Sequence, residues 1–200
     1  MIYLEYRKGN IVKGDIFVSI LFINACVREK SRTLVLAKNV LSNMSGEVVE
    51  INLNQENIPP LGGELLEKRE KLVSDGNWND PMFRYARQFA EADEIVIAAP
   101  FWDLSFPAIL KVYMEQITVS GITFEYSNGK PSGLCKAKTL TYVTTSGGPI
   151  FTDFGYEYIK ALAKNFYGIS KTKAYRAMNL DVDMISAEDV LTKADVSIVE

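Results

Sequence analysis

The sequence has no histidine among its 200 residues and only two cysteines, Cys26 and Cys135. The absence of histidine excludes Ser-His-Asp triads and histidine metal sites, and it removes the commonest general acid or base. The two cysteines lie far apart and neither belongs to a CxxC pair, so neither a zinc site nor a disulfide framework is indicated. We therefore expect a reducing, cytoplasmic location and no bound metal. If the protein is an enzyme, something other than imidazole carries its chemistry.

Basic clusters and long apolar segments are also missing. The formal net charge is −3, and no stripe of Lys and Arg offers the phosphate contacts that a nucleic acid requires. The apolar run at residues 16–25 is too short to span a bilayer and is not followed by a cleavage pattern of small residues. We therefore expect neither a nucleic-acid partner nor a membrane, and we interpret this run as a strand.

The sequence does contain an alternation of apolar runs and helical patterns, long enough for one domain over residues 1–200. Apolar runs predict strands at residues 16–24, 47–53, 95–99, 138–145 and 174–180, of which 47–53 alternates as an edge strand would. Helical spacing and capping residues predict helices at residues 34–44, 64–73, 80–92 and 154–166, from Pro107 onward, and after Ser186. Residues 1–15 form either an extra edge strand or a disordered leader.

This order of elements predicts an α/β fold. Five strands with helical, right-handed crossovers favour a flavodoxin-like doubly wound parallel sheet in the order 2-1-3-4-5, with helices on both faces. The turn sequences Asn128-Gly129 and Pro131-Ser132-Gly133 predict a hairpin-like excursion at residues 121–134.

The connection after the first of these strands has the groups needed to hold a phosphate. It lacks the GxGxxG and GK[ST] patterns of other phosphate-binding folds. It does supply the Ser31 and Thr33 hydroxyls, the cations Arg28 and Arg32, and free N–H groups at a helix N-terminus. The alternative is that Ser31 only caps the helix and that the arginines are solvated.

Two further strand ends carry unusual residues. The segment Phe101-Trp102-Asp103 follows the strand at 95–99, and Ser146-Gly147-Gly148-Pro149 follows the strand at 138–145. Adjacent glycines let a flat ligand approach the backbone, although an ordinary tight turn would also use them. The aromatic residues would equally suit core or interface packing. Because all three segments follow central strands, one ligand with a phosphate and a flat ring could touch each of them.

At these segments the chain resembles the flavodoxin-like FMN-dependent NAD(P)H:quinone oxidoreductase and azoreductase family, from about Phe17 onward. The resemblance is carried, in order, by Ser31-Arg32-Thr33, Ala98-Ala99-Pro100-Phe101-Trp102-Asp103-Leu104-Ser105, Gly121-Ile122-Thr123-Phe124-Glu125-Tyr126 and Thr145-Ser146-Gly147-Gly148. It implies FMN as the bound cofactor, NADH or NADPH as the electron donor, a small-molecule electron acceptor and a homodimer.

The same resemblance implies roles for individual residues. The FMN phosphate would be bound by Ser31, Arg32 and Thr33. The flavin would be lined by Pro100, Phe101, Trp102, Asp103 and Leu104, and its pyrimidine side would be contacted by Thr145, Ser146, Gly147 and Gly148. A substrate pocket at the dimer interface would be shaped by Tyr126, Phe124 and Trp102. No catalytic residue is assigned, because the flavin itself carries the hydride.

The chain departs from the family pattern at three places. Asp103 stands where the family often has Asn, Ser146 replaces an Arg, and Pro149 and Ile150 stand where a His is expected. A carboxylate at Asp103 could accept a hydrogen bond from flavin N3–H, and its charge would disfavour the anionic reduced flavin. The match is therefore to the scaffold and the cofactor site more than to substrate contacts.

These features predict an FMN-dependent NAD(P)H dehydrogenase acting on quinones or azo compounds. A ping-pong mechanism is expected, in which NAD(P)H reduces the flavin and leaves before the acceptor takes two electrons. The Gly147 and Gly148 N–H groups would stabilise charge on the N1–C2=O edge of the reduced flavin. One alternative is a flavodoxin-type carrier of single electrons, although such carriers are usually smaller and more acidic. The other is a flavin-free interaction module on the same fold.

Overall fold

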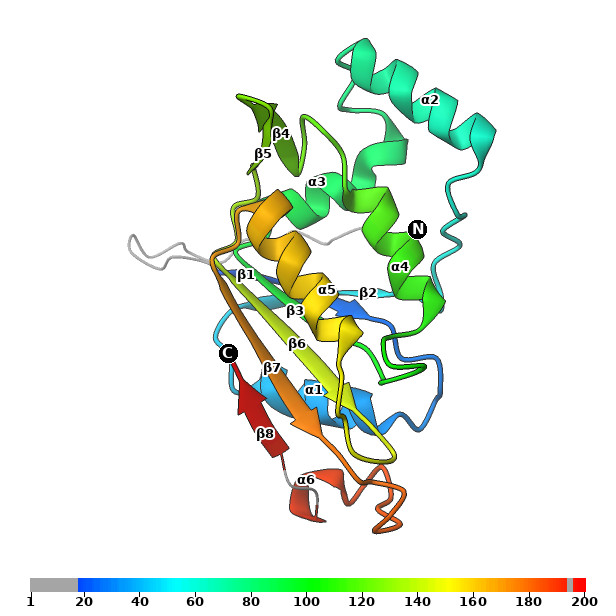
Figure 1. The fold of residues 1–200 in the computed structure, drawn as a ribbon, viewed down its shortest axis with the longest axis vertical. Helices are drawn as coiled ribbons and strands as arrows, with labels where there is room; N and C mark the ends of the chain where they lie inside the picture. Colours follow the sequence, from blue (N-terminus) through cyan, green and yellow to red (C-terminus); the bar gives the residue numbers. More distant parts are fainter. Residues whose placement is uncertain (1–17, 194–195) are drawn as a thin grey trace, which may run out of the picture.

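The computed structural model describes residues 18–193 and 196–200, so the alternatives for residues 1–15 lie outside the described residues. A six-stranded sheet in the order β2-β1-β3-β6-β7-β8 forms the centre of the molecule (Figure 1). Its strands are β1 (Ser19–Asn24), β2 (Glu47–Asn52), β3 (Glu94–Ala98), β6 (Thr139–Thr145), β7 (Lys171–Ala177) and β8 (Val196–Val199). The predicted α/β fold with a mostly parallel sheet is thus confirmed.

The predicted number of five strands is wrong. The first five strands are parallel and run β2-β1-β3-β6-β7, but β8 adds an antiparallel edge strand beside β7.

The chain was expected to end in a helix capped by Ser186. Ser186 does accept a hydrogen bond from the Asp189 N–H at 3.2 Å, yet the helix α6 spans only Val190–Lys193 before the chain returns as β8. Four residues of strand are too short to give a clear periodic signal.

The predicted strand at residues 174–180 is also displaced, because β7 begins at Lys171. The first three residues of β7 are Lys171-Thr172-Lys173, which pair with β6 at the rim of the sheet. Their polar side chains resemble a loop in the sequence, although their backbone groups belong to the ladder.

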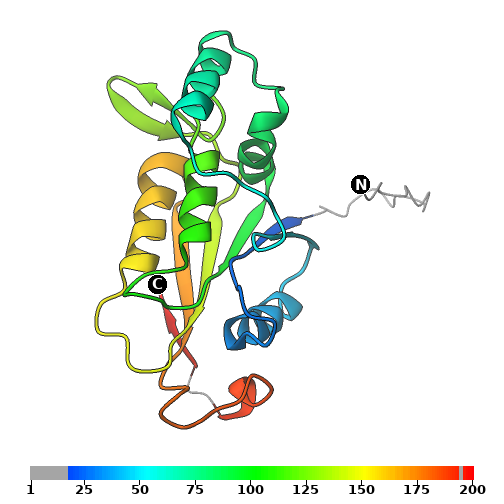
Figure 2. The same cartoon turned by 90° about the vertical axis from the view of Figure 1, so that its right-hand side faces the viewer.

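Helices cover both faces of the sheet. These helices are α1 (Arg32–Ser42), α3 (Arg84–Glu91), α4 (Ala108–Ile117) and α5 (Phe154–Leu162). The helix α2 (Gly63–Ser74) has no buried residue and lies away from the sheet (Figure 1). A 3-10 turn, Pro81–Phe83, precedes α3, and a π-helical turn, Ala163–Tyr167, continues α5. Figure 2 shows α1 on one side of the sheet and α4 and α5 on the other. Within the described residues, no helix combines the length and apolar composition that crossing a membrane requires.

Two apolar cores explain the continuous apolar runs of the central strands. In β3, Ile95 and Ile97 join the core beneath α3, α4 and α5, whereas Val96 and Ala98 join the core beneath α1. Side chains of a strand alternate between faces, so a strand covered on both faces is apolar throughout. In β2, by contrast, only Ile51 is buried, as predicted for an edge strand.

The predicted excursion at residues 121–134 is confirmed as a hairpin of β4 (Phe124–Ser127) and β5 (Lys130–Gly133). Asn128 and Gly129 have φ values of 53° and 74°, which suit a two-residue hairpin turn. The hairpin backbone lies close to the end of the π-helical turn. A Cβ added to Gly133 would come within 2.0 Å of the Gly168 nitrogen, so only glycine fits at this position. In Figure 1 the hairpin occupies the end of the molecule opposite the carboxyl ends of β6 and β7.

A buried ion pair connects α5 to β7. The Arg176 Nη2 donates to Asp153 Oδ2 at 2.9 Å, and the two side chains are 16% and 5% exposed. The other Asp153 oxygen accepts a hydrogen bond from the Tyr156 N–H at 2.8 Å and so caps α5. Because Asp153 ends the loop that follows β6, this pair fixes that loop against the sheet.

We expect Arg176→Ala to lower the free energy of unfolding by about 3–5 kcal/mol, because it leaves the Asp153 carboxylate buried without its cation. Urea unfolding measures this change. Lys193→Ala serves as the control, since it breaks the exposed Lys193–Asp189 pair and should lower the free energy of unfolding far less. Equal costs for the two variants would contradict the structural role of the buried pair.

Candidate functional site

The loops that follow β1, β3, β6 and β7 surround one cavity of about 190 Å³ at the carboxyl edge of the sheet. It is lined by Val27, Arg28, Lys30, Ser31, Arg32, Thr33, Pro100, Phe101, Trp102, Thr145, Ser146, Gly147 and Asp181. The structure therefore brings together all three segments that were singled out in the sequence. Of the residues predicted to bind the cofactor, Asp103, Leu104 and Gly148 do not line the cavity.

The loop after β1 is shaped by local hydrogen bonds. The Asn24 side chain accepts from the Cys26 N–H at 2.9 Å, and the Ser31 hydroxyl accepts from the Leu34 N–H at 3.3 Å as the N-cap of α1. Arg32 and Thr33 lie between Ser31 and Leu34 in the first turn of α1. Their N–H groups have no acceptor within the helix. Ser31 thus does cap α1, and the capped helix end borders the cavity.

The Thr33 side chain is directed differently from the prediction. Thr33 is 1% exposed, and its hydroxyl lies 2.7 Å from the Thr145 hydroxyl at the end of β6. This contact joins the loop after β1 to the loop after β6. A phosphate in the cavity would therefore meet the Thr33 N–H, while the hydroxyl holds two walls of the cavity together.

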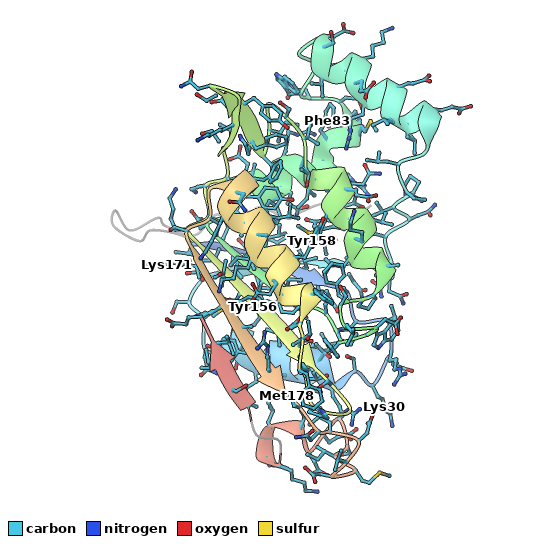
Figure 3. The ribbon with its side chains drawn as sticks, viewed as in Figure 1. Lys30, Phe83, Tyr156, Tyr158, Lys171 and Met178 are labelled. Carbon is cyan, nitrogen blue, oxygen red and sulfur yellow. The ribbon has the colours of Figure 1, made fainter. Side chains whose placement is uncertain are left out.

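Three cations and one carboxylate line the cavity. They are Arg28, Lys30, Arg32 and Asp181. Arg32 donates from Nη1 to the Ile185 carbonyl at 3.1 Å and from Nη2 to Asp181 Oδ1 at 2.5 Å. Figure 3 shows Lys30, from the loop after β1, and Met178, from the loop after β7, at the same end of the molecule.

Sequence reasoning did not select Lys30 or Asp181. The signal for Lys30 was its place in the same connection as Arg28 and Arg32. The signal for Asp181 was its place directly after the predicted last strand, which ended at residue 180. An acidic residue just beyond the carboxyl end of a parallel strand belongs to the ligand-binding edge of the sheet.

The aromatic segment forms a tight two-residue turn. Trp102 and Ser105 exchange backbone hydrogen bonds of 3.1 and 2.7 Å, and between them Asp103 and Leu104 have φ values of 50° and 64°. Both turn residues are exposed, at the outer side of the turn. The left-handed conformation is unusual for leucine, and it is held by a hydrogen bond from the Phe154 N–H to the Leu104 carbonyl at 3.0 Å.

Trp102 and Phe101 present the aromatic wall of the cavity. The Phe101 N–H donates to the Thr145 carbonyl at 3.0 Å, which fixes the segment to the end of β6. Trp102 is 37% exposed, and the Arg28 guanidinium lies 6.0 Å from its ring centroid. The wall is therefore partly open to solvent.

The glycine loop after β6 approaches the loop after β7 closely. A Cβ added to Gly147 would lie 2.0 Å from Asp181 Oδ2, so no larger residue fits there without a shift. The Ser146 hydroxyl donates to the Gly148 carbonyl at 2.5 Å. The Ser146 side chain thus folds back onto its own loop.

The predicted substrate residues of the hairpin do not reach this cavity. Phe124 is 6% exposed and packs against Tyr126 and Phe166 with ring centroids 5.5 and 5.1 Å apart. Tyr126 is 65% exposed and belongs to β4, which lies at the end of the molecule opposite the carboxyl ends of β6 and β7 (Figure 1). Of the three predicted substrate residues, Trp102 alone lines the cavity of its own chain.

The cysteine of the loop after β1, Cys26, is not among the residues that line the cavity. Burial raises the pKa of the Cys26 thiol to about 11, so it stays protonated at neutral pH. Among the residues that the structure describes, no group of three His, Cys, Asp or Glu side chains is placed to hold a metal ion. The cavity offers hydroxyls, backbone N–H groups, cations and aromatic faces.

Comparison with known proteins identifies relatives over most of the chain. The family model of the flavodoxin-like fold matches residues 19–199. An FMN-dependent NADH:quinone oxidoreductase of Clostridium perfringens is 33% identical over 180 residues, which cover 85% of this chain and 90% of that protein. A protein of the same name from Lachnoclostridium phytofermentans is 40% identical over 139 residues, which cover 68% of this chain and 70% of that protein.

Solved structures with the same fold are also known. An azoreductase of Bacillus anthracis gives a TM-score of 0.71 at 22% identity, covering 88% of this chain and 94% of that chain. An FMN-dependent NADH-azoreductase of the same species, in complex with FMN, gives 0.67 at 23% identity, covering 83% and 89%. At these identities the likeness establishes the fold alone. The family model and the sequence relatives go further: the chain belongs to the flavodoxin-like family that includes the FMN-dependent NADH:quinone oxidoreductases.

Proposed function

We propose that this protein is an FMN-dependent oxidoreductase that takes a hydride from NADH or NADPH and reduces a quinone or an azo compound. The observation that carries this proposal is the convergence of a capped helix end, an aromatic turn and a glycine loop on one cavity. The names of its relatives support the same activity.

The residues present fit the phosphate end of FMN. The Ser31 hydroxyl, the first-turn N–H groups of α1 and the cations Arg28, Lys30 and Arg32 all border the cavity. Helix N-termini and guanidinium groups favour dianions through both charge and hydrogen bonds. We assign the phosphate to Ser31, Arg32 and the Thr33 N–H.

The flavin ring fits at the mouth of the cavity. A volume of about 190 Å³ is below the range of about 300–1,000 Å³ that is typical for a whole drug-sized ligand. The cavity suits the phosphate and the sugar chain, so the ring would extend over Pro100, Phe101 and Trp102. A ring in that position would be the way for Asp103, Leu104 and Gly148, which do not line the cavity, to contact the cofactor.

The protein supplies binding and electrostatics rather than an acid or base. Bound FMN would supply hydride acceptance and donation, which explains why a chain without histidine can serve this reaction. Among the described residues, the Gly147 and Gly148 N–H groups have no protein acceptor, so they can stabilise charge on the pyrimidine edge. Trp102, partly exposed, would border the position that donor and acceptor occupy in turn. Parallel initial-velocity lines would test this ping-pong order.

A homodimer is part of the proposal. Phe151, Phe154 and Leu104 are 91%, 59% and 53% exposed, beside an apolar groove of about 500 Å³ that includes Phe106 and Tyr158. Contiguous exposed apolar side chains of this kind mark interfaces. A second copy on this face would cover the open side of the aromatic wall, and its hairpin could bring Phe124 and Tyr126 toward the pocket. Sedimentation analysis distinguishes this dimer from a monomer.

We also propose that the described residues form one domain and that the protein is cytoplasmic. The shared sheet with two cores supports the first point. The two cysteines, free and buried, support the second, because a reducing compartment keeps thiols free. Limited proteolysis and cell fractionation test these two points.

Turnover distinguishes the proposed enzyme from its alternatives. Purified protein supplied with FMN is mixed with NADH and a soluble quinone or azo dye, and NADH consumption is followed by absorbance. We expect consumption that requires both FMN and the acceptor. A protein that holds FMN but leaves NADH intact would be a carrier, and one that takes up no FMN would be an interaction module.

The phosphate assignment predicts that Ser31→Ala combined with Arg32→Ala weakens FMN binding about ten- to a hundredfold, because charge-assisted hydrogen bonds are lost. Quenching of flavin fluorescence measures the dissociation constant. Lys38→Ala is the matched control, since it removes an exposed cation from the same helix away from the cavity. An unchanged dissociation constant in the double variant would contradict the assignment.

A further inference from the structure

Asp181 is the one acidic residue among the side chains that line the cavity. Its backbone N–H donates to the Gly147 carbonyl at 3.0 Å, and its Oδ2 lies against the Gly147 Cα, where a Cβ would be 2.0 Å away. Its Oδ1 accepts from Arg32 Nη2 at 2.5 Å. The carboxylate therefore lies between the proposed phosphate end of the site and the glycine loop.

The same segment also engages Arg32 through its backbone. The Ile185 carbonyl accepts from Arg32 Nη1 at 3.1 Å, so two contacts from the loop after β7 orient the guanidinium. Arg32 is 22% exposed and Asp181 is 69% exposed. An ion pair with one partner this exposed contributes little net stability, because solvent screens the two charges. Arg32 can therefore leave Asp181 for an anion that binds it more strongly.

A phosphate in this cavity would be that stronger partner. It carries more charge than a carboxylate and offers several acceptor oxygens to a guanidinium. A carboxylate and a dianion that share one cavity also repel each other. Phosphate binding therefore requires Arg32 to turn from Asp181 to the ligand, or to serve both anions at a cost in affinity.

We propose that Asp181 is a positioning residue that competes with the ligand phosphate for Arg32 and thereby sets the affinity for FMN. This inference rests on the proposed function, because it assumes that the phosphate of FMN lies at Arg32. The Asp181 carboxylate holds the guanidinium at the cavity wall when no phosphate is bound. It lowers the affinity for FMN compared with a chain that has a neutral residue there.

Asp181→Asn tests the proposal with little change in shape. We expect FMN to bind about three- to tenfold more tightly to this variant, by flavin fluorescence quenching. Riboflavin, which lacks the phosphate, should bind both proteins equally. Asp183→Asn is the control, because it removes a charge from the same exposed loop without lining the cavity.

A second comparison separates competition from a general structural effect. In an Arg32→Ala background, Asp181→Asn should tighten FMN binding much less, because the guanidinium for which the two anions compete is gone. FMN binding that is unchanged or weaker in Asp181→Asn would overturn the inference. An equal gain for riboflavin would overturn it as well. A wild-type protein that binds no FMN would instead contradict the proposed function itself.

Discussion

The parallel pairing of β1, β3 and β6 is the constraint on which the rest of the molecule depends. Asn24 is paired with Ala98, and Ala98 with Val143, so the three strands end at nearly the same level. Parallel strands place all their carboxyl ends at one edge. Segments that are about seventy and fifty residues apart in the chain therefore surround one cavity. The positions of the side chains that line the cavity therefore depend on the register of these three strands.

Short polar contacts then fix the loops relative to one another. The Thr33 and Thr145 hydroxyls join the first and third loops, and the Phe101 N–H binds the Thr145 carbonyl. Leu104 stays in a left-handed conformation, which costs about 1 kcal/mol or more, because neighbouring backbone groups hold it. Backbone hydrogen bonds therefore fix the aromatic wall, and a fixed wall lowers the entropy cost of ligand binding.

Periodicity and strand-end chemistry predicted the parallel core and the loops that surround the cavity. The strand β8 was missed because four residues carry little periodic signal, and the start of β7 was missed because its rim residues are polar. Asp181 was missed although the predicted strand ended directly before it, because its contact with Arg32 joins residues 149 positions apart in the chain. The direction of the Thr33 hydroxyl and the distance of Tyr126 from the cavity depend on tertiary packing, which no local pattern encodes.

The most direct test of the proposed activity is an anaerobic absorbance spectrum of the purified protein supplied with FMN, recorded before and after adding NADH. We expect a bound flavin whose visible absorbance bleaches with NADH and returns when a quinone is added. A bound flavin that keeps its absorbance in the presence of both NADH and NADPH would contradict the proposed activity.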